Sequence, residues 1–136
     1  MSSPQNTEKI TDAEWKVMHV LWNQGRLSSN DIVAEVVPMT GWSPNTVRTL
    51  LIRLADKGIL QVEKEKGKEK EYPLCYYTPL YTREQCEAVH GRSFLERVFG
   101  GNASRLLAHF VKESSLTSQE IAELRAQLDQ FSDDNQ

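Results

Sequence analysis

The segment from Ser43 to Gly58 constrains the fold of this chain more than any other. Serine followed by proline is a strong helix start, because serine caps free N–H groups and proline lacks one that would stay unpaired anyway. Gly58 then marks the end of the helix. One apolar stripe recurs at the i, i+3, i+4, i+7 spacing and consists of Val47, Leu50, Leu51 and Leu54. The segment predicts an amphipathic helix from residue 44 to about residue 57.

The polar face of this predicted helix carries side chains suited to contacts with DNA bases. These side chains gather mostly in the first two turns and are Ser43, Asn45, Thr46, Arg48, Thr49 and Arg53. Arginine binds guanine through two hydrogen bonds, asparagine binds adenine, and threonine offers both a hydroxyl and a methyl group. Spacing alone leaves two interpretations open, namely the recognition helix of a helix-turn-helix domain and the solvated face of any three-helix domain.

Two shorter helices are predicted before this one. Residues 11–14 form a capping box ahead of an apolar-rich run, which Gly25 ends. That run is apolar on two faces, so we expect other elements to sandwich it. Residues 28–31 offer a second helix start, and Pro38 is expected to stop that helix, with a loop over residues 39–42.

A charged hairpin is predicted after the third helix. Residues 59–62 and 76–78 are strand-like, and Glu and Lys alternate around Gly67 between them. Alternation in an extended ribbon puts one sign of charge on each face, and the lysines concerned are Lys64, Lys66, Lys68 and Lys70. Three helices followed by a hairpin indicate a winged helix whose basic face contacts phosphates. The same alternation also suits a plain soluble loop tip.

Residues 82–136 predict three further short helices, which begin after Thr82, Asn102 and Thr117. Each carries one apolar stripe, and together these stripes comprise Phe94, Leu95, Val98, Phe99, Leu106, Leu107, Phe110, Val111, Ile121, Leu124 and Leu128. Three short helices enclose little core by themselves. We therefore expect a homodimer in which the same segment of a second chain covers the stripes.

The predicted fold is mainly α with a small β-hairpin. It comprises a winged helix-turn-helix DNA-binding domain at residues 1–81 and a C-terminal helical dimerisation arm at residues 82–136. Two-fold symmetry of such a dimer matches a pseudo-palindromic operator in double-stranded DNA.

Charge does not by itself indicate a nucleic-acid binder. The formal net charge is −3, residues 1–80 hold 10 basic and 10 acidic side chains, and residues 81–136 hold 6 and 9. A basic footprint is usual in proteins that bind nucleic acids. Any contact with DNA must therefore depend on the local placement of charge.

Several classes of protein are not expected. The sequence has no glycine-rich phosphate loop, no metal-ligand pair at proper spacing and no nucleophile with a suitable base, so we predict neither an enzyme nor a cofactor. His19 lies on the side of Trp15 and Trp22, where a packed structural role is expected. No apolar run approaches the ~20 residues of a membrane span, and two cysteines fit a reducing cytosol. A cytoplasmic protein without membrane insertion is expected.

The chain resembles the BlaI/MecI penicillinase repressors, a family that also includes the copper-responsive CopY branch, and it is closer to the BlaI/MecI branch. The resemblance covers nearly the whole chain and is carried by an ordered set of motifs, namely Thr11-Asp12-Ala13-Glu14-Trp15, Val17-Met18, Leu21-Trp22, Asp31-Ile32-Val33, Thr46 to Leu54, Lys57-Gly58, Tyr77 to Leu80, Phe94-Leu95, Phe99-Gly100-Gly101 and Ile121 to Leu124. It implies a dimeric transcriptional repressor with Asn45, Thr46 and Arg48 toward the major groove.

The resemblance also implies a route of release. In the β-lactam branch of the family, linked to antibiotic resistance, a membrane sensor perceives the antibiotic and proteolysis then cuts the repressor in the dimer arm. The matching bond here is His109–Phe110, and His109 stands where the family usually has asparagine. A cut there would sever an apolar stripe and remove the avidity of two joined modules.

Two alternative functions stay open at this point. The copper branch carries paired cysteines near its C-terminus, and no cysteine follows Cys86 in this sequence. Cys86 and His90 are nevertheless four residues apart on one predicted helix, with Cys75 on the hairpin, so a metal- or redox-responsive repressor is one alternative. The other alternative is a winged-helix module that binds a protein. The neutral charge of the first domain and an exposed Ile52 would favour it.

Overall fold

The computed structural model describes residues 4–66, 73–113 and 115–134. Its elements in chain order are η1 (Pro4–Lys9), α1 (Asp12–Gln24), β1 (Leu27–Ser28), α2 (Ser29–Thr40), α3 (Pro44–Asp56), β2 (Leu60–Lys66), β3 (Pro73–Pro79), α4 (Arg83–Phe99), α5 (Ala103–Lys112) and α6 (Ser118–Asp134). They form two compact units, Met1–Ser93 and Phe94–Gln136. The predicted boundary between a DNA-binding domain at residues 1–81 and a dimerisation domain at residues 82–136 stays a prediction.

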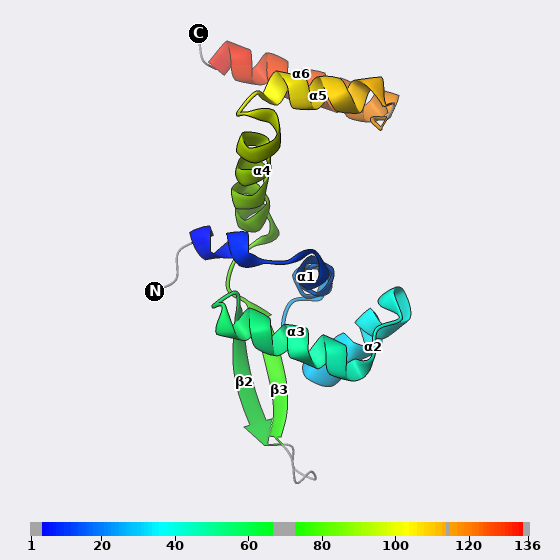
Figure 1. The fold of residues 1–136 in the computed structure, drawn as a ribbon, viewed down its shortest axis with the longest axis vertical. Helices are drawn as coiled ribbons and strands as arrows, with labels where there is room; N and C mark the ends of the chain where they lie inside the picture. The colour runs from blue at the N-terminus through cyan, green and yellow to red at the C-terminus, as the bar shows by residue number, and fades with distance from the viewer. Residues whose placement is uncertain (1–3, 67–72, 114, 135–136) are drawn as a thin grey trace. The chain divides into compact units, whose positions relative to one another are not determined.

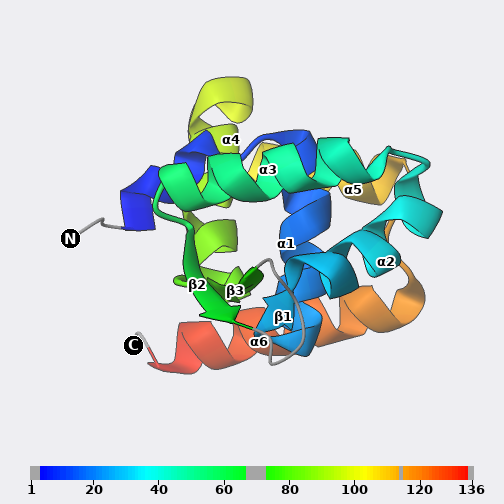
Figure 2. The same cartoon turned by 90° about the horizontal axis from the view of Figure 1, so that it is seen from below.

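The first unit is a winged helix, which confirms the predicted fold class. Three helices, α1 to α3, precede an antiparallel sheet with strand order β1-β3-β2. The views in Figures 1 and 2 show the hairpin of β2 and β3 leaving from the C-terminal end of α3. Strand β1 pairs Leu27 with Tyr77 and ties the start of α2 to the hairpin. Sequence analysis did not predict β1, because two residues are too few to show a strand pattern.

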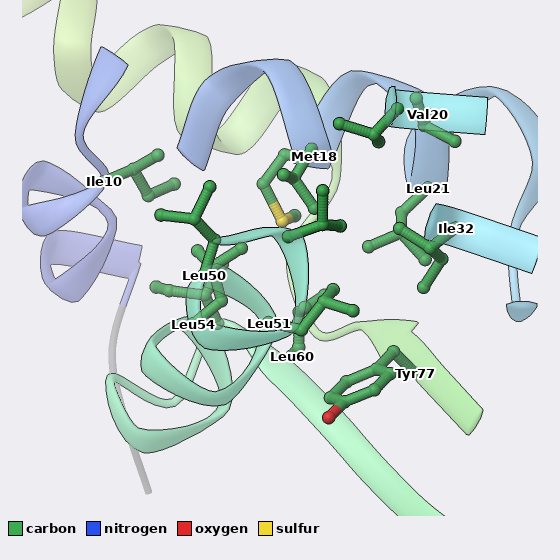
Figure 3. Packing of buried hydrophobic residues seen from close by; sticks show 14 of the residues in the cluster. Ile10, Met18, Val20, Leu21, Ile32, Leu50, Leu51, Leu54, Leu60 and Tyr77 are labelled. Carbon is green, nitrogen blue, oxygen red and sulfur yellow. The ribbon is translucent and has the colours of Figure 1, made fainter. Parts of the chain in front are cut away.

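The core of the first unit lies between α1, α2, α3 and the base of the sheet. All four residues of the predicted α3 stripe are buried. Figure 3 shows Leu50, Leu51 and Leu54 gathered near Met18 of α1. The other buried apolar residues are Ile10, Val17, Val20, Leu21, Ile32, Val36, Ile59, Leu60, Tyr77 and Cys86. This packing leaves the polar side of α3 facing outward.

The predicted helix starts are confirmed by hydrogen bonds. Thr11 and Glu14 form a reciprocal capping box, in which the Thr11 N–H donates to Glu14 Oε1 at 2.8 Å and the Glu14 N–H donates to Thr11 Oγ1 at 3.2 Å. The Thr82 N–H likewise donates to Gln85 Oε1 at 2.9 Å. Asn102 and Thr117 accept from backbone N–H groups three residues later.

The predicted end of the second helix at Pro38 is wrong. Helix α2 continues through Pro38 to Thr40. Pro38 lies in the last turn, where its missing N–H removes a single hydrogen bond. The Thr40 hydroxyl donates to the Val36 carbonyl at 2.9 Å, and Gly41, with φ of 76°, closes the helix through a hydrogen bond from its N–H to Val37 O. Local capping therefore carries the helix past the proline.

The predicted strands at residues 59–62 and 76–78 are too short. The ladder between β2 and β3 runs from Leu60 opposite Pro79 to Lys66 opposite Pro73. The side chains of residues 61–65 are exposed, so their charges do not interrupt the backbone pairing with β3. Lys68 and Lys70 lie outside the described residues.

An ion pair between a buried glutamate and a partly exposed lysine joins the first helix to the residue after α3. Lys57 Nζ lies 2.6 Å from Glu14 Oε1, and the Glu14 side chain is only 1% exposed. The same ammonium group donates to the Lys9 carbonyl at 2.8 Å. Glu14 thus both caps α1 and binds the lysine that follows α3.

The segment η1 also contacts the start of α4. Thr7 is buried, its side chain forms a hydrogen bond with the Cys86 thiol, and its carbonyl oxygen contacts Nε2 of His90. The His90 ring meets the Trp15 ring edge to face, with ring centroids 4.8 Å apart. These contacts hold the N-terminal segment between α1 and the first half of α4.

In the part of the chain that the structure describes, no helix has the length and low polarity needed to cross a membrane.

We expect Lys57→Met to lower the free energy of unfolding by about 3 kcal/mol, because the change leaves a carboxylate buried without its cation. Urea denaturation followed by circular dichroism measures this. Arg26→Met is the matched control, since it removes an arginine whose partners Glu63 and Glu65 are exposed, and it should cost much less. Equal losses in the two variants would contradict the structural role of the Glu14 pair.

Candidate nucleic-acid interface and apolar arm

The outward face of α3 carries all the side chains predicted to meet DNA bases. Ser43, Asn45, Thr46, Arg48, Thr49 and Arg53 are all exposed. A shallow depression on this face is lined by Asn45, Thr46, Thr49, Leu50 and Arg53. The structure therefore brings four of the six predicted residues together around one hollow.

The threonines on this face have their hydroxyls in local hydrogen bonds. Ser43 Oγ accepts from the Thr46 N–H at 3.2 Å and lies 3.0 Å from Thr46 Oγ1. The Thr49 hydroxyl donates to the Asn45 carbonyl at 2.9 Å. Capping and side-chain hydrogen bonds thus both restrain the N-terminal half of α3.

Arg48 lies apart from the depression, on the side of α3 toward α2. Its Nη2 group donates to Oδ1 of Asn30 at 3.4 Å. Asn30 is exposed and belongs to the first turn of α2. In the sequence, Asn30 is recognisable only as part of a helix start, and it is not among the predicted site residues.

The N-terminal end of α3 is electrostatically favourable for anions. Its first turn holds no acidic residue. Free N–H groups and the helix dipole give such an end a partial positive charge, which attracts phosphate.

Arg26 pairs with both glutamates on the acidic face of β2 and offsets part of their charge. Its guanidinium lies 2.7 Å from Glu65 and 3.4 Å from Glu63, and it stacks over the Tyr76 ring at 4.1 Å from the centroid. Residues two apart share a face of a strand, so Lys64 lies on the opposite face. The predicted separation of charges is therefore present at Lys64. The side chains of Lys66 and Lys68 lie outside the described residues.

Arg26 is a further residue that sequence analysis missed. It follows Gly25, between α1 and β1, and only the pairing of β1 with β3 brings it beside the hairpin.

Of the residues of the metal or redox alternative, Cys86 and His90 both contact Thr7, whereas Cys75 lies on the hairpin. Cys86 is fully buried, and burial raises the pKa of its thiol to about 11. Cys75 is half-buried on β3, opposite Lys64. Among the described residues, no three His, Cys, Asp or Glu side chains are grouped so as to hold a metal ion. His19 is exposed at the surface, with its ring against those of Trp15 and Trp22.

A second hollow in the first unit lies between the end of α1 and the start of α4. It is lined by Trp22, Asn23, Leu80, Tyr81, Arg83 and Glu87, among others. Arg83 donates to Asn23 Oδ1 at 2.7 Å, and its guanidinium lies over the Trp22 ring. The Trp22 indole N–H donates to the Tyr81 carbonyl at 2.9 Å. These contacts fix the start of α4 to the end of α1.

The second unit buries none of its described side chains. Large apolar residues that are at least 39% exposed are Phe94, Val98, Phe110, Val111, Leu128 and Phe131. The other predicted stripe residues, Leu95, Phe99, Leu106, Leu107, Ile121 and Leu124, are half-buried. Phe131 belongs to the same set but was not predicted. This unit lacks a core of its own within its described residues.

The predicted cleavage position lies inside α5. His109 and Phe110 are both in Ala103–Lys112, and the His109 ring contacts the Phe99 ring at a centroid distance of 5.5 Å. A protease needs an extended substrate strand, so α5 would have to open locally before this bond is cut.

Comparisons with known proteins place the chain in one family. Residues 10–130 match the family model described as Penicillinase repressor. The chain is 32% identical over 119 residues to the methicillin resistance regulatory protein MecI of Mammaliicoccus sciuri, covering 88% of this chain and 92% of that protein. It is 34% identical over 116 residues to the penicillinase repressor of Bacillus licheniformis, covering 85% and 86%. These names describe regulators rather than enzymes, as predicted.

A solved structure also resembles part of the chain. It is the solution structure of the monomeric form of Bacillus licheniformis BlaI in complex with the blaP half-operator, with 35% identity, a TM-score of 0.47, and coverage of 57% of this chain and 87% of that one. The family match, over residues 10–130, spans most of both units. The chain therefore belongs to the penicillinase repressor family.

Proposed function

We propose that this protein is a homodimeric repressor of transcription that binds double-stranded operator DNA. The observation that carries the proposal is the exposed polar face of α3, which the buried apolar stripe directs outward. A helix of this kind fits the major groove and presents its N-terminal residues to base edges. Family membership supports the same function.

In this proposal, base contacts come from α3. Asn45 and Arg53 line the depression and form no hydrogen bond or ion pair through their side chains with any described residue. Asparagine pairs with adenine, and arginine pairs with guanine or with phosphate. Arg48 has only a long bond to Asn30, so it can turn to a base or phosphate at low cost. Ser43, Thr46 and Thr49 complete the predicted contact set.

The hairpin supplies contacts with the phosphate backbone. Arg26 binds Glu63 and Glu65, which lie on the face of β2 opposite Lys64. Lys64, with Lys66 and Lys68 as the predicted continuation, forms the basic edge of the wing. Backbone contacts of this kind set orientation and give salt-dependent affinity.

The second unit, Phe94–Gln136, whose apolar side chains we call the apolar arm, joins two copies. Exposed apolar side chains on α4, α5 and α6 are best buried against the same stripes of a second chain, since burial of such surface is favourable and this unit buries none of it alone. The interface comprises the eleven predicted stripe residues together with Phe131. The winged helix of each copy then contacts one half of a pseudo-palindromic operator.

Release follows from a cut in the arm. We propose His109–Phe110 as the bond that a protease linked to a membrane sensor severs. The cut separates Phe110 and Val111 from the rest of the α5 stripe and weakens the dimer. Each module then binds its half-site without the high effective concentration that its partner supplied. A chain cut at this bond should sediment as a monomer.

Two substitutions separate base contacts from phosphate contacts. The probe is the selected duplex, meaning the sequence recovered from a randomised library by repeated binding to this protein. We expect Arg48→Ala to weaken binding by about 1–3 kcal/mol and to relax preference at one base position. Lys64→Gln should weaken all sequences alike and reduce the salt slope by about one. Fluorescence anisotropy across a salt series measures both.

Gln24→Ala, at the exposed end of α1, is the control and should leave affinity unchanged. A flat salt response with no sequence preference in the parent protein would contradict DNA binding and favour a protein-binding module.

Substitutions on the apolar arm test the dimer. Val98→Glu and Val111→Glu replace side chains that are 56% and 55% exposed in one copy, so each variant should fold, yet each puts a charge into the proposed interface. We expect monomers in sedimentation velocity and a loss of operator affinity of about 10²–10⁴-fold. Met39→Glu, at a 62% exposed position of α2, should remain dimeric. Dimers that persist in both valine variants would contradict this interface.

A further inference from the structure

We infer that α3 recognises thymine methyl groups through Thr49 and Ile52. This inference rests on the proposed function and specifies which base chemistry the helix selects. It follows from the hydrogen bonding of Thr49, the exposure of Ile52 and the spacing of the two residues.

Thr49 has no hydrogen left to donate to a base. Its hydroxyl proton is used in the 2.9 Å bond to the Asn45 carbonyl. A threonine hydroxyl has a single donor, so Thr49 offers a base only an acceptor and its methyl group. The residue is exposed on the face that meets the groove. Its methyl group is thus its main means of telling bases apart.

Ile52 is an apolar residue on this same face. Its side chain is 55% exposed, and it is the ninth of the thirteen residues of α3. A single exposed isoleucine elsewhere would need no explanation. Its exposed neighbours toward the start of the helix, Arg48 and Thr49, and the adjacent Arg53 are the residues that the proposed function directs to DNA, while the exposed Asp56 lies one turn further toward the end of the helix. Ile52 must therefore face a base or the backbone when α3 enters the groove.

The spacing of the two residues fits one groove. Thr49 and Ile52 are three positions apart on a helix, so they are surface neighbours with Cβ atoms about 5–6 Å apart. From Asn45 to Ile52 the helix rises roughly 10 Å, which is within the ~12 Å width of the major groove. With about 3.4 Å between successive base pairs, the two side chains reach bases no more than about two steps apart.

Thymine is the base that rewards apolar contact in the major groove. Its C5 methyl group is the apolar feature at that edge, whereas cytosine, adenine and guanine present hydrogen-bonding groups. Burying one methyl group against Thr49 or Ile52 is worth about fourfold in affinity. Two such contacts multiply to roughly fifteenfold, enough to bias a half-site toward two nearby thymines.

The test removes methyl groups from DNA and protein together. The selected duplex is synthesised with deoxyuridine in place of thymidine at one position at a time, which deletes only the C5 methyl group. Anisotropy titrations compare the parent protein with Thr49→Ser, which keeps the hydroxyl but loses the methyl group, and with Ile52→Ala. Met39→Ala is the control, because Met39 is an exposed apolar residue outside α3.

We expect two positions per half-site at which deoxyuridine lowers the parent's affinity about fourfold. One of these two deoxyuridine effects should vanish in Thr49→Ser, and the other should vanish in Ile52→Ala. Both effects should persist in Met39→Ala. Sequence-specific binding without any deoxyuridine effect, or with effects that persist in both variants, would overturn the inference and leave the proposed function standing. Absence of sequence-specific binding by the parent protein would instead overturn both.

Discussion

Burial of one apolar stripe of α3 against α1 and α2 is the interaction on which the rest of the structure depends. Because Val47, Leu51 and Leu54 are completely buried, the opposite face of the same helix is exposed to solvent. On that face, the serine cap and local hydrogen bonds hold the hydroxyl groups of Ser43, Thr46 and Thr49. A rigid, outward-facing helix of fixed rotation is the requirement for reading a groove.

The two units of the chain differ in how they satisfy their apolar residues. The first completes a core from α1, α2, α3 and the sheet, and Lys57 and Thr7 tie its N-terminal segment to α3 and α4. The second leaves its described apolar side chains half-buried or exposed. In the proposed function, the first unit binds DNA with its own folded core, whereas the second unit dimerises because it needs a second copy to cover its apolar side chains.

Sequence patterns predicted what depends on neighbours along the chain. Capping residues and the 3.6-residue period located α1, α3, α4, α5 and α6, because both signals act within a few residues. Features that depend on distant partners were missed. Strand β1 exists only through its pairing with β3, and Arg26 joins the hairpin by the same pairing. The bond between Lys57 and Glu14 links residues 43 positions apart, which no local pattern reveals. At Pro38 a local rule failed, because Thr40 and Gly41 capped the helix further on.

The central claim is that two copies of one outward-facing helix bind the same DNA at once. Hydroxyl-radical footprinting of the full chain on its selected duplex examines this directly. The account predicts two symmetric protected patches whose centres lie one helical turn of about 10–10.5 base pairs apart, or a whole multiple of it. One patch without a symmetric mate, or uniform protection along the duplex, would contradict it.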